Sequence, residues 1–151
     1  MAKVILIYAS MSGNTEAMAD LIEDGLRSSG VEVIKKEVMD AQVDELHEYD
    51  GIILGAYTWG DGELPDEFLD FYDDMEDIDF TGKSLAVFGS GDTAYAEFCG
   101  AVDLLERRVQ ERGGTLVTEG LKIELAPVGT DIALCKSFGE SFAQTIGMKQ
   151  R

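Results

Sequence analysis

Short apolar runs alternate along the chain with longer segments in which apolar residues recur every three or four positions. The runs are bounded by Gly, Asp or charged residues and contain many β-branched side chains, which favours strands over helices. Five strands are predicted in this way, over residues 4–8, 31–34, 52–54, 85–88 and, less regularly, 116–117 continuing to 121–125. Because the runs at 4–8, 52–54 and 85–88 are apolar at every position, they indicate a parallel sheet that is covered on both faces.

The segments between the runs follow the helical period. Residues 15–29 are predicted to form a helix, because four apolar residues recur there after Asn14 and Gly30 follows at the position of a C-cap. Three more helices are predicted from Phe68, Leu69 and Tyr72, from Val102, Leu105 and Val109, and from Ile132, Cys135, Phe138, Phe142 and Ile146. This alternation predicts one α/β domain over residues 1–151, built on a doubly wound parallel sheet.

Three loops follow predicted strands at the edge of the sheet where ligands are expected. In doubly wound sheets ligands bind beyond the C-terminal ends of the strands, at the point where the strand order reverses. The loops are SMSGNT (residues 10–15) after the first strand, GAYTWGDGE (55–63) after the third and GSGDTAYAEFCG (89–100) after the fourth.

The first loop has the composition of a phosphate site that uses no basic side chain. No Lys or Arg occurs between Lys3 and Arg27, so backbone amides and hydroxyl groups at the start of the following helix would have to bind the anion. Gly13 permits a tight turn of the backbone there. Helix capping by Ser and Asn explains the same composition equally well. A P-loop is excluded, because its Gly-Lys-Ser/Thr is missing.

The other two loops each carry an aromatic residue. Trp59, the single tryptophan, and Tyr95 both lie in loops at strand ends, where a core role is less expected than in mid-strand. Either residue alone could anchor its own loop by packing. Together, beside a phosphate site, they predict that a flat ring is held between two aromatic faces, each worth about 0.5–1.5 kcal/mol beyond its buried area.

The formal net charge of −18 excludes several classes of partner. Nucleic acid and anionic membranes would be repelled rather than recruited. Ten acidic residues fall within residues 61–79, where no Lys or Arg occurs. This stretch is either a solvated helix face or a docking surface for a basic partner.

The two cysteines, Cys99 and Cys135, lack the spacing of a metal site or a redox motif. We expect both to be small buried residues, and no metal is predicted. No segment approaches the roughly 20 apolar residues of a membrane span. The N-terminus has no signal-peptide pattern either, so a cytoplasmic location is expected.

Three motifs together resemble those of the flavodoxin family. SMSGNT is similar to its phosphate loop, TWGD (residues 58–61) to its flavin loop and GSGDTAYAEFCGAVD (89–103) to its third loop, and the similarity runs nearly end to end. The resemblance implies a five-stranded sheet of order 2-1-3-4-5 with FMN at the switch point. Residues 121–130 leave no room for the insertion of long-chain members, so the short-chain type is implied. Serine at positions 10 and 12 replaces the more common threonine.

The resemblance also implies which residues bind FMN. The loop of residues 10–15 would hold the phosphate, and Trp59 and Tyr95 would lie on opposite faces of the isoalloxazine ring. In full, the implied cofactor-binding residues are Ser10, Met11, Ser12, Gly13, Asn14, Thr15, Thr58, Trp59, Gly60, Asp61, Ser90, Gly91, Asp92, Tyr95, Phe98 and Cys99.

The function implied by the resemblance is low-potential one-electron transfer with non-covalent FMN, by a monomer without catalytic residues. The expected partners are redox proteins with basic surfaces, namely flavodoxin or ferredoxin reductases and acceptor oxidoreductases. An acidic setting would make the bound cofactor a stronger reductant, because it disfavours the anionic reduced flavin.

Three alternatives share parts of this pattern. An FMN-dependent quinone reductase would use similar loops and would oxidise NAD(P)H. A receiver domain of a phosphorelay needs an acidic pair after the first strand, where this chain has YASMSGNT. A module of a larger reductase is disfavoured, because the chain begins at a strand and ends after a helix. His47, the sole histidine, has no partner nearby in sequence and is expected at the surface.

Overall fold

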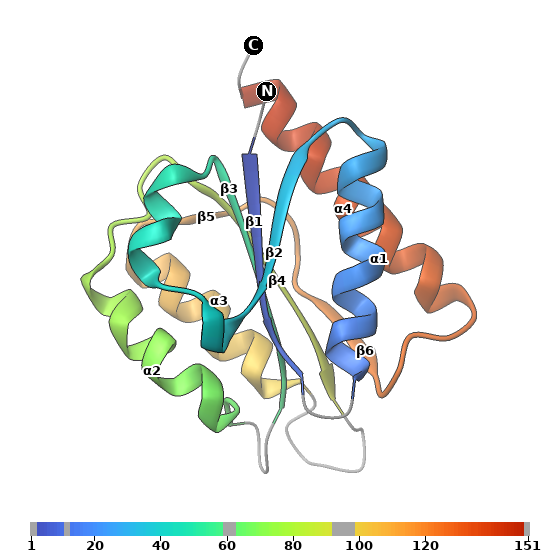
Figure 1. The fold of residues 1–151 in the computed structure, drawn as a ribbon, viewed down its shortest axis with the longest axis horizontal. Helices are drawn as coiled ribbons and strands as arrows, with labels where there is room; N and C mark the ends of the chain where they lie inside the picture. Colours follow the sequence, from blue (N-terminus) through green and yellow to red (C-terminus); the bar gives the residue numbers. More distant parts are fainter. Residues whose placement is uncertain (1–2, 11–12, 59–62, 92–98, 150–151) are drawn as a thin grey trace.

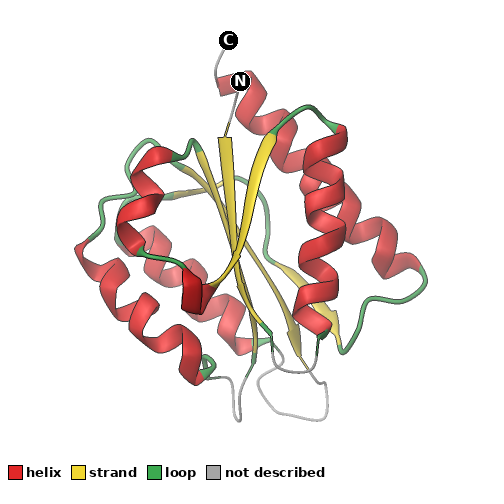
Figure 2. Ribbon diagram, viewed as in Figure 1, coloured by secondary structure: helices red, strands yellow, loops and turns green. Residues whose placement is uncertain are grey.

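A parallel sheet lies between two layers of helices in the computed structural model (Figures 1 and 2). The structure describes residues 3–10, 13–58, 63–91 and 99–149. The strands are β1 (Lys3–Ala9), β2 (Glu32–Glu37), β3 (Gly51–Tyr57), β4 (Ser84–Gly91), β5 (Thr115–Leu116) and β6 (Leu121–Glu124). The α-helices are α1 (Asn14–Ser28), α2 (Asp66–Asp74), α3 (Gly100–Glu111) and α4 (Thr130–Lys149).

The strand order is β2-β1-β3-β4-β5, and every strand pair is parallel. This confirms the predicted α/β class and the order 2-1-3-4-5. The central strands β1, β3 and β4 are buried along almost their whole length, as their uninterrupted apolar sequences require.

The fifth position in the sheet is filled by two short strands rather than one. β5 pairs with the start of β4, at Ser84 and Leu85, whereas β6 pairs with its end, from Phe88 to Gly91. The prediction of five strands was therefore wrong in number, although it located both pieces. The break follows the polar Thr118 and Glu119, which interrupt the apolar run between the two pieces.

The helices divide into two pairs, one on each face of the sheet. In Figure 1, α1 and α4 cover one face, and α2 and α3 cover the other. α1 and α4 approach closely because glycine stands at their crossing: a Cβ on Gly25 would lie 2.2 Å from the Lys136 carbonyl oxygen, and one on Gly139 would lie 2.3 Å from the Ile22 oxygen. Any larger residue at either position would force the helices apart.

Several helix predictions need correction in detail. Leu69 and Ile132, two of the apolar residues from which helices were predicted, are 42% and 41% exposed, while Phe71 and Met75 fill the core beneath α2 and the start of the 3₁₀ turn that follows it. The connection between β2 and β3 contains two 3₁₀ helices, η1 (Val38–Asp40) and η2 (Val43–Glu48). A third, η3 (Met75–Asp77), follows α2.

The two cysteines and the histidine lie where the sequence predicted. Cys99 and Cys135 are buried, as predicted, and His47 is exposed. Within the described residues, every helix is too short or too polar to cross a lipid bilayer.

Candidate functional site

The strands that precede the three predicted ligand loops end level with one another. Ala9 of β1 pairs with Ala56 of β3, which in turn pairs with Gly89 of β4. Their C-terminal ends therefore meet at one edge of the sheet, beside the first turn of α1 (Figure 1). This common edge is where a doubly wound sheet binds its ligands.

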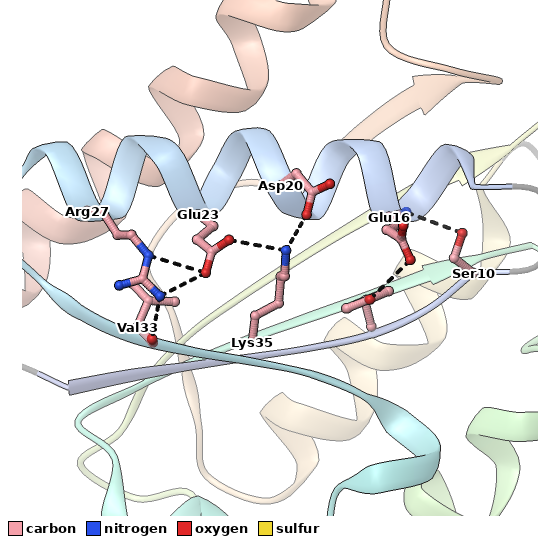
Figure 3. A network of polar contacts seen from close by, with 8 residues as sticks. Ser10, Glu16, Asp20, Glu23, Arg27, Val33 and Lys35 are labelled. Atoms are coloured by element: carbon pink, nitrogen blue, oxygen red, sulfur yellow. Dashed lines mark hydrogen bonds and ion pairs between the residues drawn. The ribbon is translucent and has the colours of Figure 1, made fainter.

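Ser10 and Gly13 shape the entry into α1. The Ser10 hydroxyl oxygen accepts hydrogen bonds from the backbone N–H groups of Gly13 (3.1 Å) and Glu16 (3.3 Å), the second of which is drawn in Figure 3. Gly13 has φ +90°, a left-handed conformation that favours glycine. The turn directs the first amides of α1, and the positive end of its dipole, toward the sheet edge.

Thr15 and Ser90 connect the first loop to the third. Their hydroxyl oxygens lie 2.7 Å apart and either can donate, and both side chains are buried. Thr58, which follows β3, donates its N–H to the Ser90 carbonyl oxygen (3.2 Å). Its own hydroxyl accepts from the N–H of Ala101 (3.2 Å). The three loop entrances are thereby held together by hydrogen bonds.

Two tyrosine–glutamate pairs at this edge were not anticipated from the sequence. The Tyr8 hydroxyl donates to Glu16 (3.2 Å), and the Tyr57 hydroxyl donates to Glu67 (3.0 and 3.1 Å). Burial first, and then the neighbouring carboxylates, raise the pKa of both phenols to about 12. In each pair a tyrosine near the end of a strand precedes a glutamate in the first turn of the next helix, and this spacing is the signal that could have revealed them.

Cys99 and Gly91 complete the described part of the third loop. Cys99 has φ +53° at the start of α3 and is fully buried, with burial raising the pKa of its thiol to about 11. Its side chain therefore packs in the core. The Gly91 carbonyl oxygen accepts from the N–H of Leu125 (2.8 Å), which fixes the end of β4.

Half of the predicted cofactor residues can be placed. The described ones are Ser10, Gly13, Asn14, Thr15, Thr58, Ser90, Gly91 and Cys99, all of which lie at this edge of the sheet. The others lie outside the described residues and stay predictions: Met11, Ser12, Trp59, Gly60, Asp61, Asp92, Tyr95 and Phe98. Among the described residues, no three His, Cys, Asp or Glu side chains are grouped to hold a metal.

Residues 6–139 match the sequence model of the family described as flavodoxin. The chain belongs to the flavodoxin family. It is 57% identical over 148 residues to probable flavodoxin 2 of Bacillus subtilis, covering 97% of this chain and 98% of that protein. The crystal structure of oxidised flavodoxin 1 from Bacillus cereus superposes with a TM-score of 0.92 at 53% identity, covering 95% of this chain and 98% of that one. A short-chain flavodoxin associated with a bacterial microcompartment gives the same TM-score at 36% identity, covering 97% and 99%.

Membership of the flavodoxin family decides against two of the alternatives raised by the sequence. The chain is a small FMN-binding electron carrier of the short-chain type, and it acts with redox partners rather than turning over a substrate of its own. The predicted cofactor and carrier function are thus confirmed. The quinone reductase and the receiver domain are set aside.

Proposed function

We propose that this flavodoxin binds the FMN phosphate at the N-terminus of α1, with Ser10, Gly13, Asn14 and Thr15 as contacts among the described residues. Ser12 of the same loop completes the proposed set. The buried hydrogen bond between Thr15 and Ser90 is the observation that carries the proposal, because it seats the first turn of α1 against the end of β4. This hydrogen bond holds the donors of α1 in place against the sheet, which lowers the entropic cost of binding a ligand.

The donor set fits a phosphate ester better than a free polyphosphate. The loop offers hydroxyl groups and amides of a helix N-terminus, and no Lys or Arg stands between Lys3 and Arg27. Neutral donors give directional hydrogen bonds without long-range attraction, which a net charge of −18 further weakens. Binding then depends on the rest of the ligand being held elsewhere.

The flavin ring is proposed to lie between Trp59 and Tyr95. Support comes from Thr58, whose two hydrogen bonds fix the residue immediately before Trp59. The ring edge is proposed to meet Thr58, Gly60, Asp61, Gly91 and Asp92, with Met11, Ser90, Phe98 and Cys99 nearby. When bound, FMN supplies one-electron chemistry. The acidic surroundings supplied by the chain disfavour added negative charge there, which makes a low potential the expected result.

The proposed partners are redox proteins with basic docking surfaces, that is, flavodoxin or ferredoxin reductases and acceptor oxidoreductases. The outward face of α2 carries exposed acidic residues at Asp66, Asp70, Asp73 and Asp74, within the acidic stretch of residues 61–79. A surface of one sign raises the rate at which oppositely charged proteins meet. We propose further that the protein acts as a cytoplasmic monomer.

A titration of the cofactor-free protein with FMN and with riboflavin tests the proposed phosphate site. FMN is expected to bind at least tenfold more tightly, since several hydrogen bonds of about 1 kcal/mol each are added. Replacing Trp59 or Tyr95 by Ala should weaken both ligands by a similar factor. Equal affinity for FMN and riboflavin would show that residues 10–15 only cap the helix.

A further inference from the structure

Three carboxylates follow one another along the side of α1 that faces β2. Figure 3 shows Glu16, Asp20 and Glu23 on this side, with Lys35 of β2 reaching toward two of them. The Lys35 ammonium group pairs with Asp20 and with Glu23 (3.1 Å), and Arg27 also pairs with Glu23 (2.9 Å). Two of the three carboxylates are therefore paired with cations.

Glu16 differs from the other two because its partner is neutral. The Tyr8 hydroxyl donates to its carboxylate at 3.2 Å, and Tyr8 is buried in the core beneath α1. A phenol with a pKa of about 12 stays protonated at neutral pH and can only act as a donor here. The hydrogen bond thus orients Glu16 without cancelling its charge.

Among the described residues Glu16 has no cationic partner, and its charge lies close to the proposed phosphate site. Glu16 lies in the first turn of α1, and its own N–H group donates to the Ser10 hydroxyl oxygen. The positive end of a helix dipole attracts a first-turn carboxylate as readily as it attracts a bound phosphate. Because Glu16 is exposed, its side chain could turn toward those amides if nothing held it.

We infer that Tyr8 is a positioning residue for the phosphate site: its hydroxyl holds the Glu16 carboxylate toward β2, so that it neither occupies nor repels an anion at the N-terminus of α1. This inference rests on the proposed FMN phosphate site. Tyr8 acts through Glu16 and therefore changes only the part of the FMN binding free energy that comes from the phosphate group. The ratio of the riboflavin Kd to the FMN Kd measures that part alone.

The test is a set of fluorescence titrations of the cofactor-free protein with FMN and riboflavin. The proteins are the parent chain, Tyr8→Phe, Glu16→Gln and the double variant. Tyr8→Phe should lower the ratio about two- to fivefold, the size expected for one charge near a helix terminus. In the Glu16→Gln background the same change should leave the ratio unaltered. At 1 M salt, where the Debye length is about 3 Å, the effect of Tyr8→Phe should disappear.

Tyr57→Phe is the matched control. It removes the same kind of hydroxyl, from a tyrosine that also donates to a glutamate in the first turn of a helix. Tyr57 directly precedes Thr58 in the loop proposed to hold the ring. Its loss should therefore change the FMN and riboflavin affinities by the same factor and leave the ratio at the parent value.

The outcomes separate the inference from the function on which it rests. A parent ratio of one overturns the phosphate site and the inference together. A high parent ratio that Tyr8→Phe leaves unchanged overturns the inference alone. An equal loss with and without the Glu16 carboxylate also overturns it, because Tyr8 would then act by packing. If Tyr8→Phe does not fold, the comparison of Glu16→Gln with the parent decides. Removing a carboxylate that can only repel the phosphate should not weaken FMN binding, so a ratio below that of the parent would overturn the inference.

Discussion

Thr15 in α1 and Ser90 in β4 lie 75 positions apart in the sequence, and their hydroxyl oxygens are 2.7 Å apart in the core of the ligand-binding edge. Both side chains are almost fully buried, at 1% and 3% exposure. Burying a hydroxyl group costs free energy unless the group is hydrogen-bonded. The Thr15 and Ser90 hydroxyls each give the other the hydrogen bond that offsets this cost. The first and third loops are therefore coupled through this hydrogen bond.

This coupling predicts a non-additive effect on stability. Ser90→Ala should lower the free energy of unfolding of the cofactor-free protein by about 1–3 kcal/mol, because the Thr15 hydroxyl is left without its partner. Thr15→Val should have a similar effect. The double variant should lose less than the sum of the two losses. Urea denaturation measures all three values, and additive losses would show that the two hydroxyls do not depend on each other.

Gly25 and Gly139, where α1 and α4 cross, should not tolerate even a methyl side chain. Gly25→Ala or Gly139→Ala should destabilise the protein by about 1–3 kcal/mol, because the new methyl group would lie within 2.3 Å of a backbone carbonyl oxygen. Intrinsic helix propensity alone would predict a gain of stability for both changes. Gln144→Ala, at an exposed position of α4, is the control and should be nearly neutral. A stabilised Gly25→Ala variant would mean that the helices can separate at little cost.

The acidic face of α2 should govern association with a basic redox partner. Replacing Asp66, Asp70 and Asp74 by Asn should slow electron transfer about three- to tenfold at low ionic strength and reduce its salt dependence, with little change in FMN affinity. Glu67 is left in place, because it accepts the Tyr57 hydrogen bond. Stopped-flow measurements with a basic reductase give the rates.

A variant with the same change in net charge is the control for that experiment. Glu32→Gln, Asp44→Asn and Glu48→Gln remove three exposed charges outside α2. This variant should bind the partner at close to the parent rate. Equal slowing by both variants would indicate that net charge, rather than the face of α2, controls the encounter.

The charge of Glu23 should stabilise the folded protein at neutral pH and lose this effect at acidic pH. Burial alone would raise the pKa of Glu23, but hydrogen bonds from Arg27 and Lys35 outweigh it and hold the pKa below its ordinary value of 4.5. A carboxyl group with a lowered pKa in the folded state stabilises the protein above its unfolded pKa and loses that contribution as the pH falls through the folded value. Glu23→Gln should therefore cost about 0.5–1 kcal/mol at pH 7.

The pH dependence of that loss distinguishes an ion pair from simple packing. As the pH falls below 4.5 and then through the lowered pKa of Glu23, the difference between Glu23→Gln and the parent should shrink toward zero, as measured by urea denaturation across the pH range. Asp24→Asn, at an exposed position of the same helix, is the control and should be nearly neutral at pH 7. A loss that stays constant down to low pH would contradict the role assigned to the charge.

The sequence predicted the layers of the fold because its signals there are local and redundant. Strands buried on both faces leave apolar runs, and each amphipathic helix repeats its apolar side several times. The exposure of Leu69 and Ile132 could not be predicted, because the period of a helix does not fix which side of it faces the sheet. The division between β5 and β6 depends on whether Thr118 and Glu119 pair with β4. The short apolar runs on either side of these two residues do not show whether they do.

The candidate site could be predicted as a set of loops but not as a set of contacts. Glycine, hydroxyl and aromatic residues after successive strands indicate where a ligand binds, since parallel strands end at the same edge. The bond between Thr15 and Ser90 depends on the register of β1, β3 and β4, and no local pattern specifies it. The same holds for Tyr8 and Glu16, which approach only because β1 and α1 pack at one particular angle.

The division between β5 and β6 also protects the sheet from pairing with other chains. An exposed strand edge can template aggregation when it is long, flat and apolar. On one side of this sheet the outermost strands span only two and four residues. On the other side β2 is longer, but its sequence EVIKKE places charges of both signs along the strand. The edge formed by β5 and β6 is thus too short, and the edge formed by β2 too highly charged, to favour pairing with further chains into fibres.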